Sequence, residues 1–284
     1  MEITFWGVRG SIPSPGPEFN RYGGNTPCVS VRTKRGSLVI LDAGTGITVL
    51  GRSLMGSEFG NGAGQATLLL THAHWDHIQG FPFFAPVFIP GNTFTIYGSS
   101  ESPTMVEGIL EGQMDPHFSP VHSLRNLGAR IEVLAAQDGV SFDVGDLHIT
   151  GRINPHGRYS ALAYRLEEGD RSLVYAPDAG YPDGAPAPAV QEMYRGASIL
   201  IHDCTYTPED QDARRSRGQS SIADAARIAA SCSVTTLVMF HYDQDYTDDQ
   251  VDALRDRCRA ILDAEPGGKD IKLVAAAEGL TLEL

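Results

Sequence analysis

The chain has 284 residues, of which 42% are hydrophobic and 20% charged, an ordinary globular composition that excludes a disordered protein. It carries 22 Lys and Arg against 35 Asp and Glu, so its formal net charge is −13. A chain this acidic repels phosphate backbones, so broad nucleic-acid binding is not expected. The one basic cluster, Arg214, Arg215 and Arg217, is expected to be solvated or to attract a substrate phosphate.

The compartment is expected to be the cytoplasm, without membrane contact. The first residues lack the basic segment and the long apolar stretch of a signal peptide, and no apolar run approaches the length of a membrane span. Four cysteines lie far apart and form no CxxC pair, so buried free thiols are expected at Cys28, Cys204, Cys232 and Cys258.

Short β-rich runs separated by glycine-rich turns dominate the first two thirds of the chain. The runs expected as strands are 3–7, 28–33, 37–41, 66–71, 94–97, 130–134, 147–153, 161–166, 171–176, 198–202, 236–241 and 272–275. This pattern predicts a sheet-rich core.

Helices are clearest late in the chain. Apolar residues repeat at three- and four-residue steps over 251–262, and Thr247 with Gln250 predicts a capping box at the start of that helix. A second apolar stripe covers 222–229, and 102–123 is expected as a helix plus loop, a flap beside a site. No repeat or linker divides the sequence, so one domain is expected over residues 1–284.

The most informative segment follows the apolar run at 68–70. His72, His74, Asp76 and His77 occupy six positions there, and imidazole and carboxylate are the usual ligands of zinc and its first-row neighbours. Side chains alternate along a strand, so the four converge only if the chain leaves the strand in a tight turn. Taken alone, the segment also fits a histidine-rich surface turn without a metal.

Three further ligand types follow other expected strands. His156 comes after the run 149–153, Asp178 after 173–176, and His241 directly after 237–240. Loops beyond one edge of a layered sheet gather side chains in this way. The set then has five histidines and two carboxylates, enough for two metal ions with an aspartate between them.

These residues match a known pattern. The chain resembles the metallo-β-lactamase superfamily, whose signature H-x-H-x-D-H is followed by a later His, Asp and His. The resemblance implies a mixed α/β fold (α+β), a four-layer αββα sandwich. It also implies one metal at His72, His74 and His156, a second at Asp76, His77 and His241, and a bridging Asp178.

A narrower resemblance rests on four segments: 5–11 (FWGVRGS), 22–28 (YGGNTPC), 41–46 (LDAGTG) and 200–206 (LIHDCTY). They are similar to the ribonuclease Z and cyclic-nucleotide phosphodiesterase branch, which implies a possible homodimer. Where that branch often carries Gly-His-Ser, this chain has Gly218-Gln219-Ser220, and a glutamine cannot carry a proton charge at neutral pH. No long basic insertion for gripping tRNA is present, so tRNA 3′-processing is the less favoured function.

The favoured function is a dinuclear-metal hydrolase, a phosphodiesterase for a small nucleotide or cyclic nucleotide. Two ions would share a water or hydroxide, and Asp76 is the expected catalytic proton acceptor. Zinc is the first choice of metal, with manganese or iron as alternatives. Other substrates that suit this chemistry are a lactone, a thioester or an organophosphate. A hypothesis of another class is a metal-binding sensor or interaction domain with little turnover.

Several neighbours carry two interpretations each. Asp42 and Asp203 are expected either to orient a ligand histidine or to cap a turn. His117 could reach a substrate phosphate, and Gln219 lies at the substrate side. Arg9 is expected to be solvated or to face the site, and Trp75 to pack or to stack on a substrate ring. The remaining expectations are a structural His202, and His122 and His148 at the surface.

Overall fold

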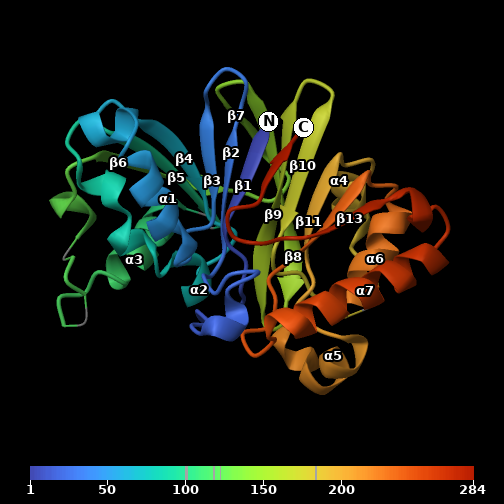
Figure 1. Cartoon of the computed structure of the whole chain (residues 1–284). Helices are drawn as coiled ribbons and strands as arrows, with labels where there is room; N and C mark the ends of the chain where they lie inside the picture. The colour runs from blue at the N-terminus through green and yellow to red at the C-terminus, as the bar shows by residue number, and fades with distance from the viewer. Residues whose placement is uncertain (100–101, 118, 122, 183) are drawn as a thin grey trace.

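Two β-sheets pack face to face and carry helices on their outer faces (Figure 1). This computed structural model describes residues 1–99, 102–117, 119–121, 123–182 and 184–284. The first sheet has the order β14-β1-β2-β3-β4-β5-β6, and the second β13-β12-β11-β10-β9-β8-β7.

The first sheet consists of β1 Glu2–Gly7, β2 Cys28–Arg32, β3 Leu38–Leu41, β4 Gln65–Leu69, β5 Thr93–Ser99, β6 Arg130–Ala136 and β14 Thr281–Glu283. The second consists of β7 Ser141–Val144, β8 Leu147–His156, β9 Tyr159–Glu168, β10 Arg171–Ala176, β11 Ile199–Asp203, β12 Thr236–Phe240 and β13 Lys272–Ala275. The α-helices are α1 Gly46–Leu54, α2 Trp75–Ile78, α3 Pro103–Gly112, α4 Pro188–Tyr194, α5 Pro208–Arg214, α6 Ile222–Ser231 and α7 Asp248–Ala264.

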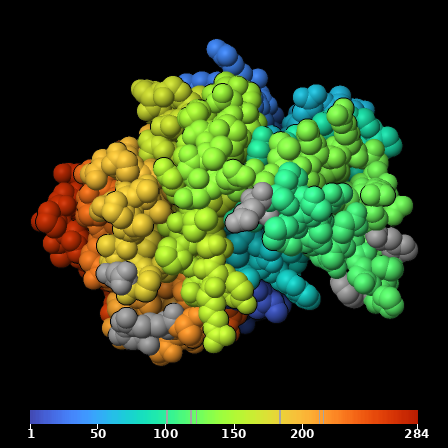
Figure 2. Space-filling model, turned by 180° about the vertical axis from the view of Figure 1, so that it is seen from behind, coloured from blue at the N-terminus to red at the C-terminus, as the bar shows by residue number. Residues whose placement is uncertain are grey.

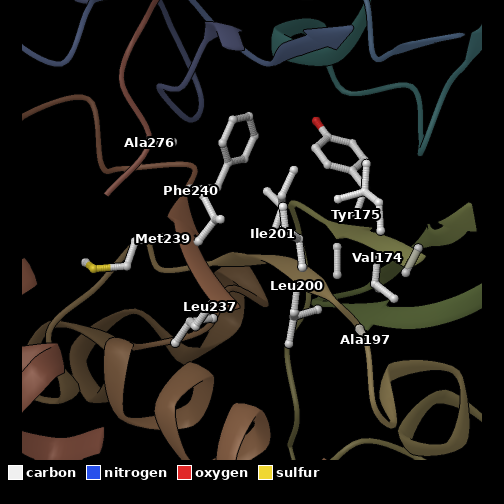
Figure 3. Packing of buried hydrophobic residues seen from close by; sticks show 14 of the residues in the cluster. Val174, Tyr175, Ala197, Leu200, Ile201, Leu237, Met239, Phe240 and Ala276 are labelled. Carbon is white, nitrogen blue, oxygen red and sulfur yellow. The ribbon is translucent and has the colours of Figure 1, made fainter. Parts of the chain in front are cut away.

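Alternation along the strands explains the layers. In β3, Val39 and Leu41 belong to the core shared with the second sheet, whereas Leu38 and Ile40 pack under α1 on the outer face. Strands buried on both faces read as continuous apolar runs, which is why β3, β11 and β12 were recognisable in the sequence. Figure 3 shows side chains of β10, β11 and β12, such as Val174, in the same core.

Parallel pairing sets where the site lies. Strands β3, β4, β5 and β6 run parallel, as do β10, β11, β12 and β13, so within each group the carboxyl ends meet at one edge. Strand β8 is antiparallel to β9, which is antiparallel to β10, so β8 also ends at the edge where β10 ends. Figure 2 shows the back of the molecule, where the yellow-green β8–β9 surface lies between the earlier and later parts of the chain.

All twelve expected strands form, with ends shifted by a few residues, and Thr247 and Gln250 make the predicted capping box of α7. The structure adds β7 and β14, which are too short to show a clear pattern, and α1, whose glycines resemble a turn. The four cysteines are free and buried.

The helix expected within 102–123 forms as α3, but its expected role as a flap beside the site is wrong. Helix α3 buries Val106 and Leu110 in the cluster on the outer face of the first sheet, beside β5 and β6. His122 lies outside the described residues. In the described part of the chain, no helix has both the length and the apolar character that crossing a membrane requires.

Candidate metal centre

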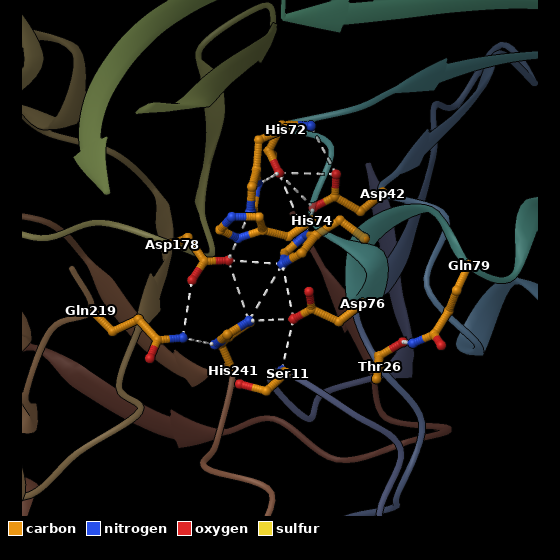
Figure 4. Close-up of polar contacts among 12 residues, drawn as sticks. Ser11, Thr26, Asp42, His72, His74, Asp76, Gln79, Asp178, Gln219 and His241 are labelled. Carbon is orange, nitrogen blue, oxygen red and sulfur yellow. Dashed lines mark hydrogen bonds and ion pairs between the residues drawn. The ribbon is translucent and has the colours of Figure 1, made fainter. Parts of the chain in front are cut away.

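Seven side chains from both sheets meet at the shared edge (Figure 4). The first sheet supplies His72 and His74 in the turn after β4, then Asp76 and His77 in the first turn of α2. The second sheet supplies three more from strand ends, and these are His156, Asp178 and His241. The tight turn that the histidine spacing requires is therefore the break between β4 and α2.

The seven form three overlapping groups whose ligand atoms lie within 4.8 Å of one another. These groups are His72, His74 and His156; His72, His77 and Asp178; and Asp76, His77 and His241. Asp178 Oδ2 lies 2.7 Å from His77 Nε2, 3.2 Å from His241 Nε2 and 3.8 Å from His72 Nε2. Asp178 thus lies between the two outer groups, where a bridging carboxylate would have to be.

The donor set fits divalent metal ions. His72 Nε2 is buried without a hydrogen-bond partner in the described structure, and such an orphaned polar atom is rare unless an ion or water satisfies it. Imidazole nitrogens and carboxylate oxygens in groups of three are ligand sets that zinc, manganese and iron accept. Contacts among the seven residues do not satisfy His72 Nε2, which faces the other candidate ligands.

Electrostatics separates the histidines into two kinds. Burial and the neighbouring His77 lower the pKa of His72 well below its usual value, and burial with His156 lowers that of His74. Burial also lowers the pKa of His241, but Asp178 and Asp76 outweigh it and raise that pKa to about 9. The pKa of His77 is likewise raised, because Asp76 and Asp42 outweigh the lowering effect of burial. His72 and His74 are therefore ready to bind a cation near neutral pH, whereas His77 and His241 must first lose protons.

Asp42 supports the site from the end of β3. Its Oδ2 lies 2.7 Å from His77 Nδ1 and accepts a hydrogen bond from Tyr175 Oη at 3.0 Å. Its Oδ1 accepts from the backbone N–H of Thr71 at 2.8 Å. Asp42 therefore fills both expected roles, since it orients a histidine ring and holds the turn that follows β4.

Asp203 acts on the site through a neighbour. It accepts hydrogen bonds from the backbone N–H groups of Ser220 and Ala179 and from the Thr205 hydroxyl at 2.6 Å. Thr205 Oγ1 in turn lies 3.1 Å from His241 Nδ1. Burial and the nearby Asp178 raise the pKa of Asp203 to about 7. Asp203 thus fixes the loops after β10 and β11 and, through Thr205, the ring of His241.

Gln219 lies beside the cluster as part of a brace. Its Nε2 donates to Asp178 Oδ1 at 3.2 Å and lies 3.4 Å from His241 Nδ1, while the preceding carbonyl, Gly218 O, is 2.9 Å from His156 Nδ1. Gly218 has φ +72°, and a Cβ there would lie 1.7 Å from Gly157 N. The close backbone contact holds the segment over the turn that carries His156.

Other expected neighbours lie elsewhere. The His117 side chain is 90% exposed and bonds Asp115 in its own loop, and no described contact joins it to the cluster. Trp75 is 76% exposed, so the packing role is wrong: α2 turns it outward while Asp76 and His77 face in. His202 is buried against Tyr181 and His148 pairs with Asp143 at the surface, as expected for structural and surface residues.

The expected solvation of Arg9 is wrong. Its side chain is fully buried, donating to the carbonyls of Gly23 and Tyr246 and lying 3.6 Å from Asp248. The Gly-Ser turn gave no sign of this, because the acceptors come from segments far along the chain.

The basic cluster divides into parts with different surroundings. Arg214 ends α5 and pairs with the buried carboxylate of Asp243, so it does not lie in a loop. Arg217 is exposed at a cavity of about 510 Å³ whose wall includes His74, His156 and Gln219. The side chain of Arg215 lies outside the described structure.

Sequence reasoning missed the supporting residues Thr71, Thr205 and Ser11. Ser11 donates its backbone N–H to Asp76 Oδ2 at 2.7 Å, which no side-chain pattern can reveal. Thr71 and Thr205 did leave a signal, since each directly adjoins or closely follows an acidic or histidine residue at a strand end.

A family model described as the beta-lactamase superfamily domain matches residues 39–242, which contain all seven residues of the cluster. The chain belongs to the metallo-β-lactamase superfamily. Ribonuclease Z of Natronomonas pharaonis is 26% identical, covering 88% of this chain and 89% of the relative. Ribonuclease Z of Mycobacterium marinum is 29% identical, covering 95% and 94%.

Solved structures share the whole fold. Zn(2+)-bound PqqB from Methylobacterium extorquens has a TM-score of 0.71 at 16% identity and covers 100% of both chains. Yeast PDE1 has a TM-score of 0.66 at 14% identity, covering 100% of this chain and 99% of its own. A diphosphatase of the PhnP family has a TM-score of 0.65 at 19% identity, covering 100% and 97%. At these identities the likeness concerns the fold alone.

Proposed function

We propose that the chain is a dinuclear-metal phosphodiesterase that hydrolyses a small phosphate ester such as a nucleotide or cyclic nucleotide. The observation that carries this proposal is the convergence of seven ligand-type side chains, six of them buried, beside a cavity that His74 and His156 line together with exposed arginines. The names of similar proteins, ribonuclease Z and a diphosphatase, support chemistry at a phosphate linkage.

In this proposal, His72, His74 and His156 would hold one ion and Asp76, His77 and His241 the other, and Asp178 would be available to both. When bound, divalent ions supply Lewis-acid charge that acidifies a water and offsets negative charge on the phosphoryl oxygens. Zinc is the first choice because histidine predominates, and manganese or iron also suits the donor set.

The protein's own groups do the positioning. The Ser11 N–H fixes Asp76 Oδ2, which lies 3.2 Å from His241 Nε2, so this carboxylate faces the cluster as a proton acceptor. Asp42 holds His77 by its outer nitrogen, and Thr205 holds His241 in the same way. Gln219 donates a hydrogen bond at the substrate side but cannot deliver a proton, so a leaving group departs without acid assistance from this residue.

The test is elemental analysis of the purified protein together with turnover of bis-(p-nitrophenyl) phosphate after loading with zinc, manganese or iron. A cyclic nucleotide and a lactone are assayed in parallel. Lactone turnover without phosphodiester turnover would move the function to the lactone alternative. Bound metal without turnover of any ester would favour a sensor or interaction domain.

The matching variant is Asp178→Ala, which should lose metal and turnover together because the bridging carboxylate is removed. Asp143→Ala is the control, since Asp143 also pairs with a histidine, His148, but at the surface. Unchanged metal content and turnover in Asp178→Ala would overturn the assignment of the site.

A further inference from the structure

The cavity beside the cluster has a wall of unusual composition. Besides two of the candidate metal ligands, it is lined by Ile12, Arg158, Tyr159 and Arg217. The proposed function uses only the charge of the two arginines and assigns none of the four a contact with substrate. They come from the loop after β1, the β8–β9 turn and the segment that follows α5.

Two cations are brought together at this wall by backbone packing. Gly157 has φ +59°, and a Cβ there would lie 2.8 Å from Ser216 O, so the β8–β9 turn rests directly on the segment that contains Arg217. Arg158 and Arg217 are both exposed, and neither pairs with a carboxylate within the described residues. Arg217 Nη1 donates to the Tyr206 hydroxyl at 3.4 Å, a neutral partner that leaves its charge uncompensated. In a chain of net charge −13, guanidinium groups without a carboxylate partner beside the candidate metal ligands form a local anion site.

An apolar surface adjoins the cations. The Tyr159 ring stands edge-on to the His74 ring, with centroids 5.4 Å apart, yet 69% of Tyr159 is exposed. Ile12 is 58% exposed on a loop that the Ser11 N–H ties to Asp76. Large apolar side chains held in place but left open to solvent at a cavity are suited to contact a ligand.

We propose that this cavity recognises a phosphate ester with a planar ring: Arg158 and Arg217 contact the phosphate oxygens, and Tyr159 with Ile12 holds the ring. This inference rests on the proposed function and narrows its substrates to aryl or nucleoside esters over alkyl esters. Because the Tyr159 ring contacts the ring of His74, a substrate ring held by Tyr159 would lie next to the candidate metal ligands.

The test compares two non-hydrolysable ligands, phenylphosphonate and methylphosphonate, by calorimetric titration of the metal-loaded protein. The expected result is about tenfold tighter binding of phenylphosphonate, the scale of one aromatic stacking contact. Tyr159→Ala should remove most of that preference, and Tyr159→Phe should retain it. Arg158→Gln and Arg217→Gln should weaken both ligands alike, because both carry the same anion.

The controls are Phe83→Ala, an aromatic side chain 57% exposed that does not line the cavity, and metal content of every variant. Equal affinity for both phosphonates in the unaltered protein overturns the inference, as does a full ring preference in Tyr159→Ala. Turnover of bis-(p-nitrophenyl) phosphate separates the two proposals. Turnover without ring preference rejects this inference alone, whereas ring preference without turnover rejects the phosphodiesterase and leaves the ring site.

Discussion

Replacing Asp42 by Asn changes one atom and should weaken metal binding at the group formed by Asp76, His77 and His241. Asp42 has φ +59°, a conformation that asparagine tolerates, so the backbone is not disturbed. The side chain keeps its volume. The substitution removes the accepting character of one oxygen and the negative charge that helps to raise the pKa of His77.

The direction of the effect follows from the four donors around Asp42, which are the backbone N–H and the hydroxyl of Thr71, the Tyr175 hydroxyl and His77 Nδ1. The Thr71 backbone N–H must keep an acceptor, so the amide oxygen takes the Oδ1 position. The amide NH₂ then faces Tyr175 and His77, where Oδ2 accepted before. His77 Nδ1 has to accept this bond, which places the ring proton on Nε2, the atom 2.7 Å from Asp178. A protonated Nε2 cannot bind a metal.

Loss of such an outer partner typically lowers metal affinity about 10- to 100-fold, or about 1.4 to 2.7 kcal/mol. The assay is titration of zinc against a competing chelator, with circular dichroism as the check on folding. Asp248→Asn is the matched control, because Asp248 is a buried carboxylate that accepts from the backbone of Arg21 and Tyr22 and does not touch the cluster. Unchanged affinity for both ions in Asp42→Asn would refute the reasoning.

Two other expectations follow from the geometry. The raised pKa values of His77 and His241, the latter about 9, stabilise the metal-free fold fully below the unfolded value near 6.5, and this contribution is lost as pH rises through about 9. Urea denaturation of the metal-free protein should therefore show falling stability from pH 7 to 9.5, and a flat profile would contradict it. Gln219→Ala removes the hydrogen bond that the Gln219 amide donates to the Asp178 carboxylate, worth about 1.5 kcal/mol for a charged acceptor, so kcat should fall about tenfold. Gln219→His should add an ionisation to the pH–rate profile that Gln219→Ala lacks, and identical profiles would argue against a position at the substrate side.

The candidate ligands could be predicted because strand ends are visible in sequence. Buried parallel strands read as apolar runs, and the carboxyl ends of such runs meet at one edge, so the sequence itself predicts that His156, Asp178 and His241 lie close together. The fold class followed from the same runs and from the superfamily signature.

What escaped prediction depends on contacts between distant segments. Arg9 is buried because carbonyls near residues 23 and 246 close over it, and nothing near position 9 records them. The exposure of Trp75 follows from the direction in which the four-residue helix α2 turns, which periodicity cannot give. The cavity wall with Arg158 and Arg217 exists only because glycines 157 and 218 touch.

The division of the cluster between the two sheets has a mechanical consequence. Four candidate ligands are anchored to the first sheet and three to the second. The distances between these two sets therefore depend on how the sheets are aligned. A slip by one residue of strand rise, about 3.3 Å, exceeds the 2.7 Å contact between His77 and Asp178. Core residues between the two sheets, such as Leu41 and Leu166, therefore help to set the distances between the candidate ligands. Substitutions that repack these core residues should lower metal affinity while the fold itself persists.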